Sequence, residues 1–317
     1  MRRRSSAVAI RTSRTVAAVG AFTQLNPTLE PVPFVSDMNT PDPRYYQIAV
    51  LSLLVIYGIA ALDFGIRWQN ALAIFCAAEA AQFIGTRAAG LSRFDPLSPI
   101  ITSLSLTLLL RTDTVLLALL AAFVAIGSKF LVRVQGKHVF NPANVALVSL
   151  MLLFDNAWVS SGQWGSAVIG TLLLGCLGCL VLTRAKRAET TIMFLCVYTA
   201  LIFGRAQWLG DPLSIPLHQL QNGALLIFAF FMISDPKTTP DTRLGRLAFG
   251  AIVASVAYTI QYVYYTPNGV ILALVMSAPL VPLIDTIFRG ENYRWDQPGN
   301  RAINPGTSFS THGKGVF

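Results

Sequence analysis

Residues 219–246 read QLQNGALLIFAFFMISDPKTTPDTRLGR and contain the contrast that decides the fold of this chain. The part that ends at Ser234 is largely apolar and uncharged, whereas the part from Asp235 onward holds two prolines, three threonines and five charges. A long apolar run is typical of a helix buried in lipid, and Pro236 ends it because proline cannot extend a helix. The stretch therefore predicts a membrane helix followed by a polar loop.

The composition extends this prediction to most of the chain. Of its 317 residues, 54% are hydrophobic and 12% are charged, and the mean hydropathy is +0.57. A soluble domain carries about a quarter charged residues. The net charge of +9 would indicate a nucleic-acid partner in a soluble protein. Here the basic residues lie in short loops between apolar runs, so we expect a lipid bilayer and no nucleic acid as partner.

We predict an all-α membrane protein with about ten transmembrane helices. The windows are residues 46–63, 71–85, 98–110, 114–130, 141–154, 164–183, 191–204, 219–234, 247–264 and 270–288. A helix needs about 20 apolar residues to cross a bilayer, and the third, fifth and seventh windows are shorter than that. Short or broken helices are tolerated where protein or a wet cavity covers the backbone, so some of these are expected to be half-helices around a central site.

The distribution of positive charge predicts the orientation. With the N-terminus in the cytoplasm, every Lys and Arg except Arg67, Arg111 and Arg205 falls on the cytoplasmic side. The positive-inside rule describes this asymmetry. We therefore expect a multi-pass protein of the cell inner membrane with both termini cytoplasmic.

Polar segments flank the predicted membrane domain, which covers residues 46–288. Residues 1–45 are rich in Arg and Ser and are interpreted as a cytoplasmic arm that lies on anionic lipid. An organellar transit peptide has the same composition, and that alternative stays open. Residues 289–317 form a polar cytoplasmic tail.

The two halves of the chain echo each other. Asp-Pro-Leu-Ser occurs at residues 95–98 and 211–214, and a proline opens both the fifth window, at Pro142, and the tenth, at Pro267. This predicts two five-helix repeats, about 46–154 and 164–288, and the odd number of helices requires them to be inverted. Inverted repeats place a shared site at their interface near broken helices. Chance similarity of proline-rich loops is the alternative interpretation.

Two loops carry the candidate binding residues. After Asp235, the side chains of Lys237, Thr238, Thr239 and Arg243 are suited to an anion such as phosphate, although a well-capped loop has the same composition. Asn141 and Asn144 are three residues apart and are expected to share one face at the start of a helix, where their amides suit a polar heterocycle. The simpler interpretation is that Asn-Pro begins a helix.

Other polar residues lie inside apolar windows. Glu79 is mid-span and is a candidate for an ion path or for a structural pair, because intramembrane acids are costly. Asp285 lies near the end of the last window, where a structural role is favoured. Cys176 and Cys179 lie with glycines in the sixth window and suit helix packing. No metal-ligand pattern, phosphate-binding glycine loop or catalytic motif is present, and no catalytic residue is predicted.

These stretches resemble one family, which comprises the D subunit of the Rnf complex and the B subunit of the sodium-translocating NADH:quinone oxidoreductase (Nqr). The resemblance rests on three signatures: Phe140-Asn141-Pro142-Ala143, then residues 229–246, and residues 267–270 with 281–285. It covers about residues 45–290. It implies two inverted five-helix halves in a complex that passes electrons between flavins and iron–sulfur centres while pumping Na⁺ or H⁺.

The resemblance also bears on the cofactor. Family members carry FMN on a threonine in a Ser-Gly-Ala-Thr motif, and the corresponding loop here, residues 155–163, has no threonine. Covalent FMN is therefore not expected, whereas the resemblance leaves room for a noncovalent FMN or riboflavin. It implies that Asn141, Asn144 and Asp235 bond the ring and that Lys237, Thr238, Thr239 and Arg243 steady its polar tail.

Three functions remain open from the sequence. The first is a membrane subunit of an Rnf-like or Nqr-like electron-transport complex, part of an ion-translocating oxidoreductase, with other membrane and peripheral redox subunits as partners. The second is a stand-alone transporter or channel that uses the same inverted repeat. The third is a structural anchor for redox partners. The transported ion, the electron donor and the acceptor are not encoded in any recognisable pattern.

Overall fold

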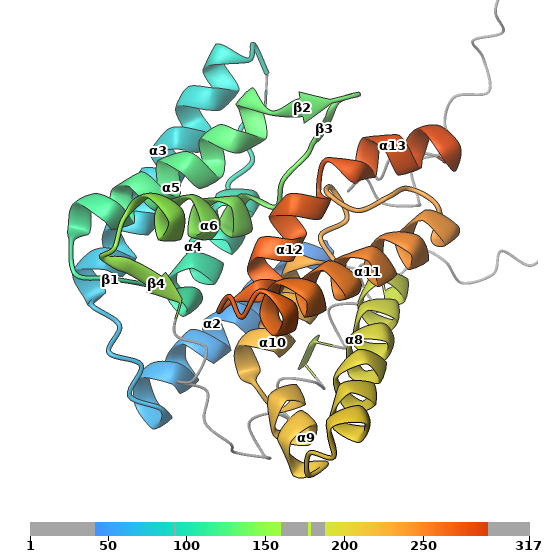
Figure 1. Ribbon diagram of the computed structural model, residues 1–317. Coiled ribbons are helices and arrows are strands. Elements are labelled where there is room, and N and C mark those ends of the chain that lie inside the picture. The colour runs from blue at the N-terminus through green and yellow to red at the C-terminus, as the bar shows by residue number, and fades with distance from the viewer. Residues whose placement is uncertain (1–41, 92, 160–176, 179–187, 291–317) are drawn as a thin grey trace, which may run out of the picture. The chain divides into compact units, whose positions relative to one another are not determined.

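The computed structural model describes residues 42–91, 93–159, 177–178 and 188–290, and these residues form helices joined by short strands (Figure 1). Each predicted window of the first half overlaps one helix. These helices are α2 (Pro43–Ala61), α3 (Trp68–Ala88), α4 (Leu97–Leu109), α5 (Val115–Leu131) and α6 (Pro142–Leu153).

The second half contains helices that are broken or locally widened. The sixth window lies outside the described residues except at 177–178. The helices that follow are α8 (Ala188–Leu209), α9 (Ser214–Leu220), α10 (Gly223–Ile227), the π-helix η2 (Phe228–Met232), α11 (Arg243–Tyr258), the π-helix η3 (Thr259–Val263), α12 (Gly269–Ser277) and α13 (Leu280–Ile287). π-Helical turns are rare and are frequent at functional sites.

Helix length and composition support a membrane protein. Three helical stretches among the described residues are long and apolar enough to cross a bilayer: Pro43–Ala61, Ala188–Leu209 and Arg243–Val263. Two bent pairs, α9 with α10–η2 and α12 with α13, bend by 50° and 52° and bring the number to five if each is one span. Helices α4, α5 and α6 are apolar but shorter. The helical membrane architecture is confirmed in this form, and ten spans stay a prediction.

Helix packing follows a common order in the two halves. In the first half α3 packs against α5 and α5 against α6, and in the second half α8 packs against α11 and α11 against α12. Helix α2 lies along α4 (Figure 1). Helices α6 and α12 meet and join the two halves.

Two short sheets, which the sequence did not predict, connect the helices. Strand β1 (Leu110–Thr112) pairs antiparallel with β4 (Ala157–Val159). Strand β2 (Arg133–Val134) pairs with β3 (Lys137–His138) across Gln135 and Gly136, whose φ angles are +52° and +82°. Positive φ at both turn residues is the geometry of a two-residue hairpin. The hairpin leads the chain from α5 to α6, so His138 and Asn141 come to lie beside the end of α5.

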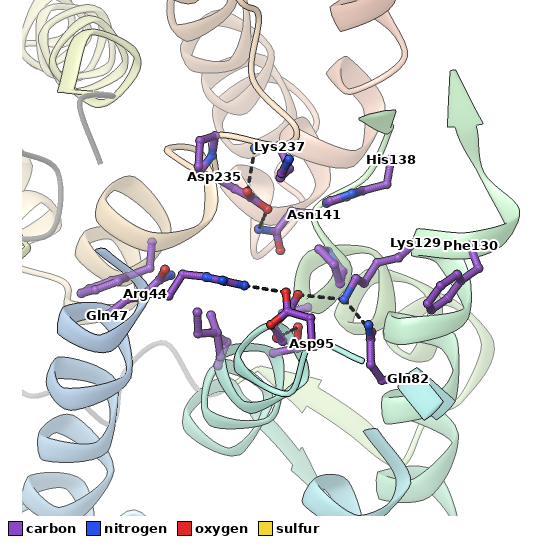
Figure 2. A pocket seen from close by; sticks show the side chains of 18 of the residues that line it. Arg44, Gln47, Gln82, Asp95, Lys129, Phe130, His138, Asn141, Asp235 and Lys237 are labelled. Carbon is purple, nitrogen blue, oxygen red and sulfur yellow. Dashed lines mark hydrogen bonds and ion pairs between the residues drawn. The ribbon is translucent and has the colours of Figure 1, made fainter. Parts of the chain in front are cut away.

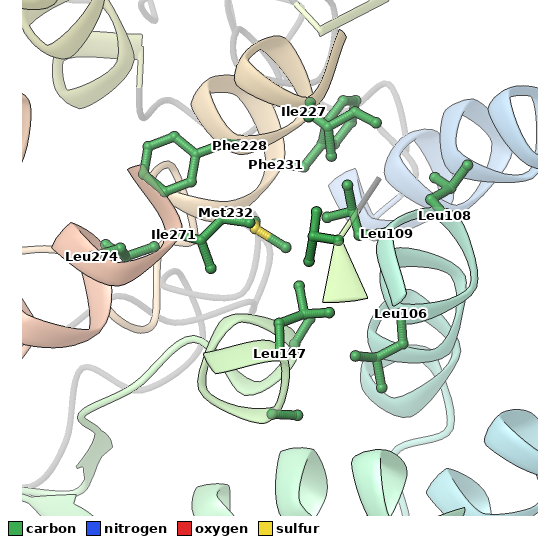
Figure 3. Packing of buried hydrophobic residues seen from close by; sticks show 14 of the residues in the cluster. Leu106, Leu108, Leu109, Leu147, Ile227, Phe228, Phe231, Met232, Ile271 and Leu274 are labelled. Atoms are coloured by element: carbon green, nitrogen blue, oxygen red, sulfur yellow. The ribbon is translucent and has the colours of Figure 1, made fainter. Parts of the chain in front are cut away.

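The core is built from both halves. Figure 3 shows Leu106 and Leu109 of α4 and Leu147 of α6 beside Met232 of η2 and Ile271 of α12. Each of these side chains is buried. Close packing of large apolar side chains gives the backbone little freedom to shift. The polar loop after η2 is therefore held in a defined position against the start of α6.

Candidate functional site

A cavity of about 310 Å³ lies where the ends of several first-half helices meet the loop after η2 (Figure 2). Its size is at the lower end of the range of ligand cavities, about 300–1,000 Å³. Its polar wall includes Arg44, Gln82, Thr86, Arg93, Asp95, Lys129, Arg133, His138, Asn141, Asp235 and Lys237. Phe130 and Phe231 supply aromatic surface.

Asn141 and Asp235 meet in this cavity although they lie in different halves. Asn141 is the N-cap of α6, and its Oδ1 accepts from the backbone N–H of Asn144 at 3.1 Å. Its Nδ2 lies 3.4 Å from Asp235 Oδ2 and 3.4 Å from the carbonyl of Met232, which sits at the end of η2. The helix cap therefore also connects the two halves, and its amide faces the cavity.

Lys129 is one of the cavity residues that sequence reasoning missed, as are His138 and Arg44. It is 8% exposed, and its Nζ donates to Gln82 Oε1 at 2.9 Å and to Ser98 Oγ at 2.8 Å (Figure 2). Both acceptors are neutral. The sequence signal is a lysine at the end of the apolar run 115–131, which the positive-inside rule counts only as a loop charge.

Arg44 neutralises one of the cavity's carboxylates. Its Nη1 lies 2.5 Å from Asp95 Oδ2, and its Nη2 lies 2.7 Å from Asp42 Oδ2. Asp95 also accepts from the backbone N–H of Leu97 at 3.2 Å at the start of α4. The repeated Asp-Pro-Leu-Ser motif thus places an ion-paired acid at the cavity wall in the first half.

His138 is a neutral group at the same wall. Burial lowers the pKa of His138 to about 4, and the nearby carboxylate of Asp235 opposes this shift without cancelling it. At neutral pH the imidazole therefore presents one N–H donor and one acceptor nitrogen. The cavity combines a buried ammonium group, a neutral imidazole and an amide within one small volume.

Not all predicted binding residues reach the cavity. Asn141, Asp235 and Lys237 line it, whereas Asn144, Thr238, Thr239 and Arg243 do not. Asn144 donates to the Ile271 carbonyl at 3.0 Å, and the two threonine hydroxyls donate to the Asp235 carbonyl. The side chain of Arg243 is 84% exposed and lies 3.4 Å from Glu189. Asn144 and the two threonines therefore bond the backbone near the cavity, and Arg243 lies at the surface.

The intramembrane acids have different surroundings. Glu79 lies on α3 within electrostatic reach of Lys129 and is outside the cavity lining. Asp285 accepts from Lys137 Nζ at 2.9 Å and from the backbone N–H of Asp241 at 2.9 Å. This agrees with the structural role favoured for Asp285. Cys176 and Cys179 lie outside the described residues.

The second half of the chain matches the NQR2, RnfD, RnfE family. The match covers residues 157–294, which include η2, Asp235 and Lys237. The resemblance read from the signatures at 229–246, 267–270 and 281–285 is confirmed by this match. Asn141 and Lys129 precede the matched residues, so the first-half part of the resemblance stays a prediction.

Curated relatives carry the name of a component of a complex. Proteins named as the D subunit of an ion-translocating oxidoreductase complex, from Escherichia coli O1:K1 and from Citrobacter koseri, are each 31% identical over 139 residues. That stretch is 43% of this chain and 35% of each relative. The chain thus spans about a third of the length of the relatives it matches.

Proposed function

We propose that this chain is an integral membrane subunit of an ion-translocating oxidoreductase complex of the Rnf or Nqr type. The observation that carries the proposal is the cavity in which Asn141, which caps α6, meets Asp235, which follows the π-helix η2. Two of the three signatures that carry the resemblance meet in this contact. The names of the relatives support other redox subunits as partners.

A noncovalent flavin suits the residues of this cavity. Phe130 and Phe231 offer aromatic surface to a planar ring, and the polar groups of His138, Asn141 and Asp235 match a ring edge that both donates and accepts hydrogen bonds. The flavin when bound supplies the redox chemistry, whereas the protein binds, orients and excludes water. The absence of a Ser-Gly-Ala-Thr sequence favours noncovalent binding.

The membrane arrangement follows from the same reasoning. The matching order of helix contacts in the two halves supports two inverted five-helix repeats. Arg93, Arg133 and Lys237 line the cavity and belong to loops that the positive-inside rule assigns to the cytoplasm. We infer an inner-membrane protein with cytoplasmic termini whose cavity opens toward the cytoplasm.

Flavin analysis of the purified chain with its co-purifying subunits tests the proposal. We expect a flavin absorption band at about 450 nm, released without proteolysis because the cofactor is noncovalent. Asn141→Ala and Asp235→Ala should each lower the flavin content, because each removes a cavity hydrogen-bonding group. The control Arg243→Ala changes an exposed side chain outside the cavity and should leave the flavin content unchanged. A flavin content equal in all three variants contradicts the proposed site.

A stand-alone transporter or channel is the second candidate. Glu79, Lys129 and Asp95 act on one another electrostatically inside the helix bundle, an arrangement that suits an ion path. A colourless preparation that moves Na⁺ or H⁺ across liposomes without redox partners would support this function. In that case Glu79→Gln should abolish the movement.

A further inference from the structure

The charge of Lys129 has no carboxylate counter-ion among the described residues. Its Nζ donates to two neutral oxygens, and no described carboxylate oxygen lies within ion-pair distance, 4.0 Å. A buried ammonium group is costly unless it is paired, and neutral hydrogen bonds offset only part of that cost. A lysine kept in this state needs a compensating negative charge from another source.

The two carboxylates of the cavity are engaged by other groups. Asp95 binds the Arg44 guanidinium, and Asp235 accepts from the backbone N–H of Lys237 at 3.0 Å and faces the amide of Asn141. Both carboxylates act on Lys129 only at longer range. The remaining charged groups of the lining are Arg93, Arg133 and Lys237, so the cavity as a whole is positive.

One N–H donor of Lys129 and the hydroxyl group of Thr86 line this cavity without a hydrogen-bond partner among the described residues. The ammonium group of Lys129 has three N–H donors, and Gln82 and Ser98 use two of them. Thr86 lies one turn after Gln82 on α3, lines the same cavity and is 4% exposed. Its Oγ1 is buried and has no hydrogen-bond partner. An incoming acceptor would satisfy both groups.

We propose that the cavity holds its ligand through an anionic oxygen that accepts from Lys129 Nζ and Thr86 Oγ1. The identity of the ligand rests on the proposed function. If the ligand is FMN, its phosphate group supplies the anionic oxygen. Free phosphate has the same chemistry. The anion supplies the missing counter-charge, and the neutral anchors Gln82 and Ser98 hold the ammonium group in place.

Ligand titration of the full-length chain in detergent, with its co-purifying subunits, tests the inference. FMN and riboflavin share one ring and differ in the phosphate, so their affinities are measured by flavin fluorescence, with inorganic phosphate as competitor. Lys129→Met should weaken FMN about ten- to a hundredfold, since a charge-assisted hydrogen bond is lost, and should leave riboflavin unchanged. Thr86→Val should weaken FMN less, by about three- to tenfold.

Control measurements separate binding from folding. Arg243→Gln removes an exposed cation outside the cavity and should bind FMN as the wild type does. The rise in Tm that saturating FMN produces reports binding independently of the basal Tm, and Lys129→Met should lose that rise. A lysine with only a structural role would lower the basal Tm and keep the rise.

The outcomes distinguish this inference from the proposed function. If phosphate binds the wild type but not Lys129→Met and no flavin binds, the anion site stands and the flavin function is overturned. If flavins bind the wild type and Lys129→Met equally, the inference is overturned while the flavin function stands. Failure of both FMN and phosphate to bind the wild type overturns the anion site.

Discussion

A buried lysine, Lys129, and a partly buried one, Lys137, lie eight positions apart in sequence and have opposite surroundings. Lys137 Nζ contacts Asp241 Oδ1 at 3.0 Å, Asp285 Oδ2 at 2.9 Å and the Thr239 carbonyl at 2.9 Å, so all three of its donors and its charge are satisfied. Among the described residues Lys129 has only two acceptors, both neutral, and it faces a cavity. Lys137 joins the β2–β3 hairpin to the second half, whereas Lys129 is left available to a ligand.

The largest expected effect on stability comes from removing Lys137, the lysine that is paired with two carboxylates. Lys137→Met leaves the buried carboxylates of Asp241 and Asp285 without a cation, and we expect a loss of about 3–5 kcal/mol in the free energy of unfolding. Thermal unfolding in detergent measures it. Lys129→Met should cost much less, about 1 kcal/mol, because only neutral partners are released. Similar Tm losses in the two variants would contradict the distinction between the two lysines.

A smaller effect concerns His138, which follows Lys137 on the same strand and lines the cavity. Its folded pKa of about 4 lies below the ordinary value of about 6.5, so protonation favours the unfolded state. Stability is fully present above about pH 6.5 and should fall by about 3 kcal/mol as the pH drops toward 4. Tm recorded against pH for the wild type and His138→Gln measures this. The substitution should flatten the slope in that pH range, and an unchanged slope would show that another group titrates there.

The smallest expected effect on stability concerns an uncharged hydrogen bond in the second half that corresponds to the Lys129–Gln82 contact. There Tyr198 donates to Gln261 Oε1 at 3.0 Å, which joins α8 to η3 much as the Lys129–Gln82 contact joins α5 to α3. Tyr198 and Gln261 line a smaller cavity, about 100 Å³. Gln261→Leu removes this acceptor of the buried Tyr198 hydroxyl, which keeps a side-chain hydrogen bond with Tyr262, and should cost about 0.5–1 kcal/mol.

Gln261→Leu should not alter FMN binding, because the described residues that line its cavity are uncharged. The double variant Tyr198→Phe, Gln261→Leu removes both ends of the bond, so its loss in Tm should be smaller than the sum of the losses of the two single variants. A loss of FMN affinity in Gln261→Leu as large as in Lys129→Met would show that the two cavities do not differ in function.

Much of the helical framework and part of the site could be predicted from the sequence. Every predicted window within the described residues overlaps a helix, because runs of apolar side chains favour helices whatever their neighbours are. The family resemblance implied that Asn141 and Asp235 bind one ligand and so lie close together. The bends of 50° and 52° were not predicted, since they depend on which helices cover the broken backbone.

The sequence alone determined the membrane character, the helix-forming segments and the motifs at 141–144 and 235–246, because hydropathy and proline act locally. Only the tertiary structure decided which polar groups find partners. It joined Lys137 to Asp241 and Asp285 and left Lys129 facing a cavity with neutral acceptors. The physical reason is that the free energy of a buried charge depends on the atoms within a few ångströms, and residues distant in sequence supply those atoms.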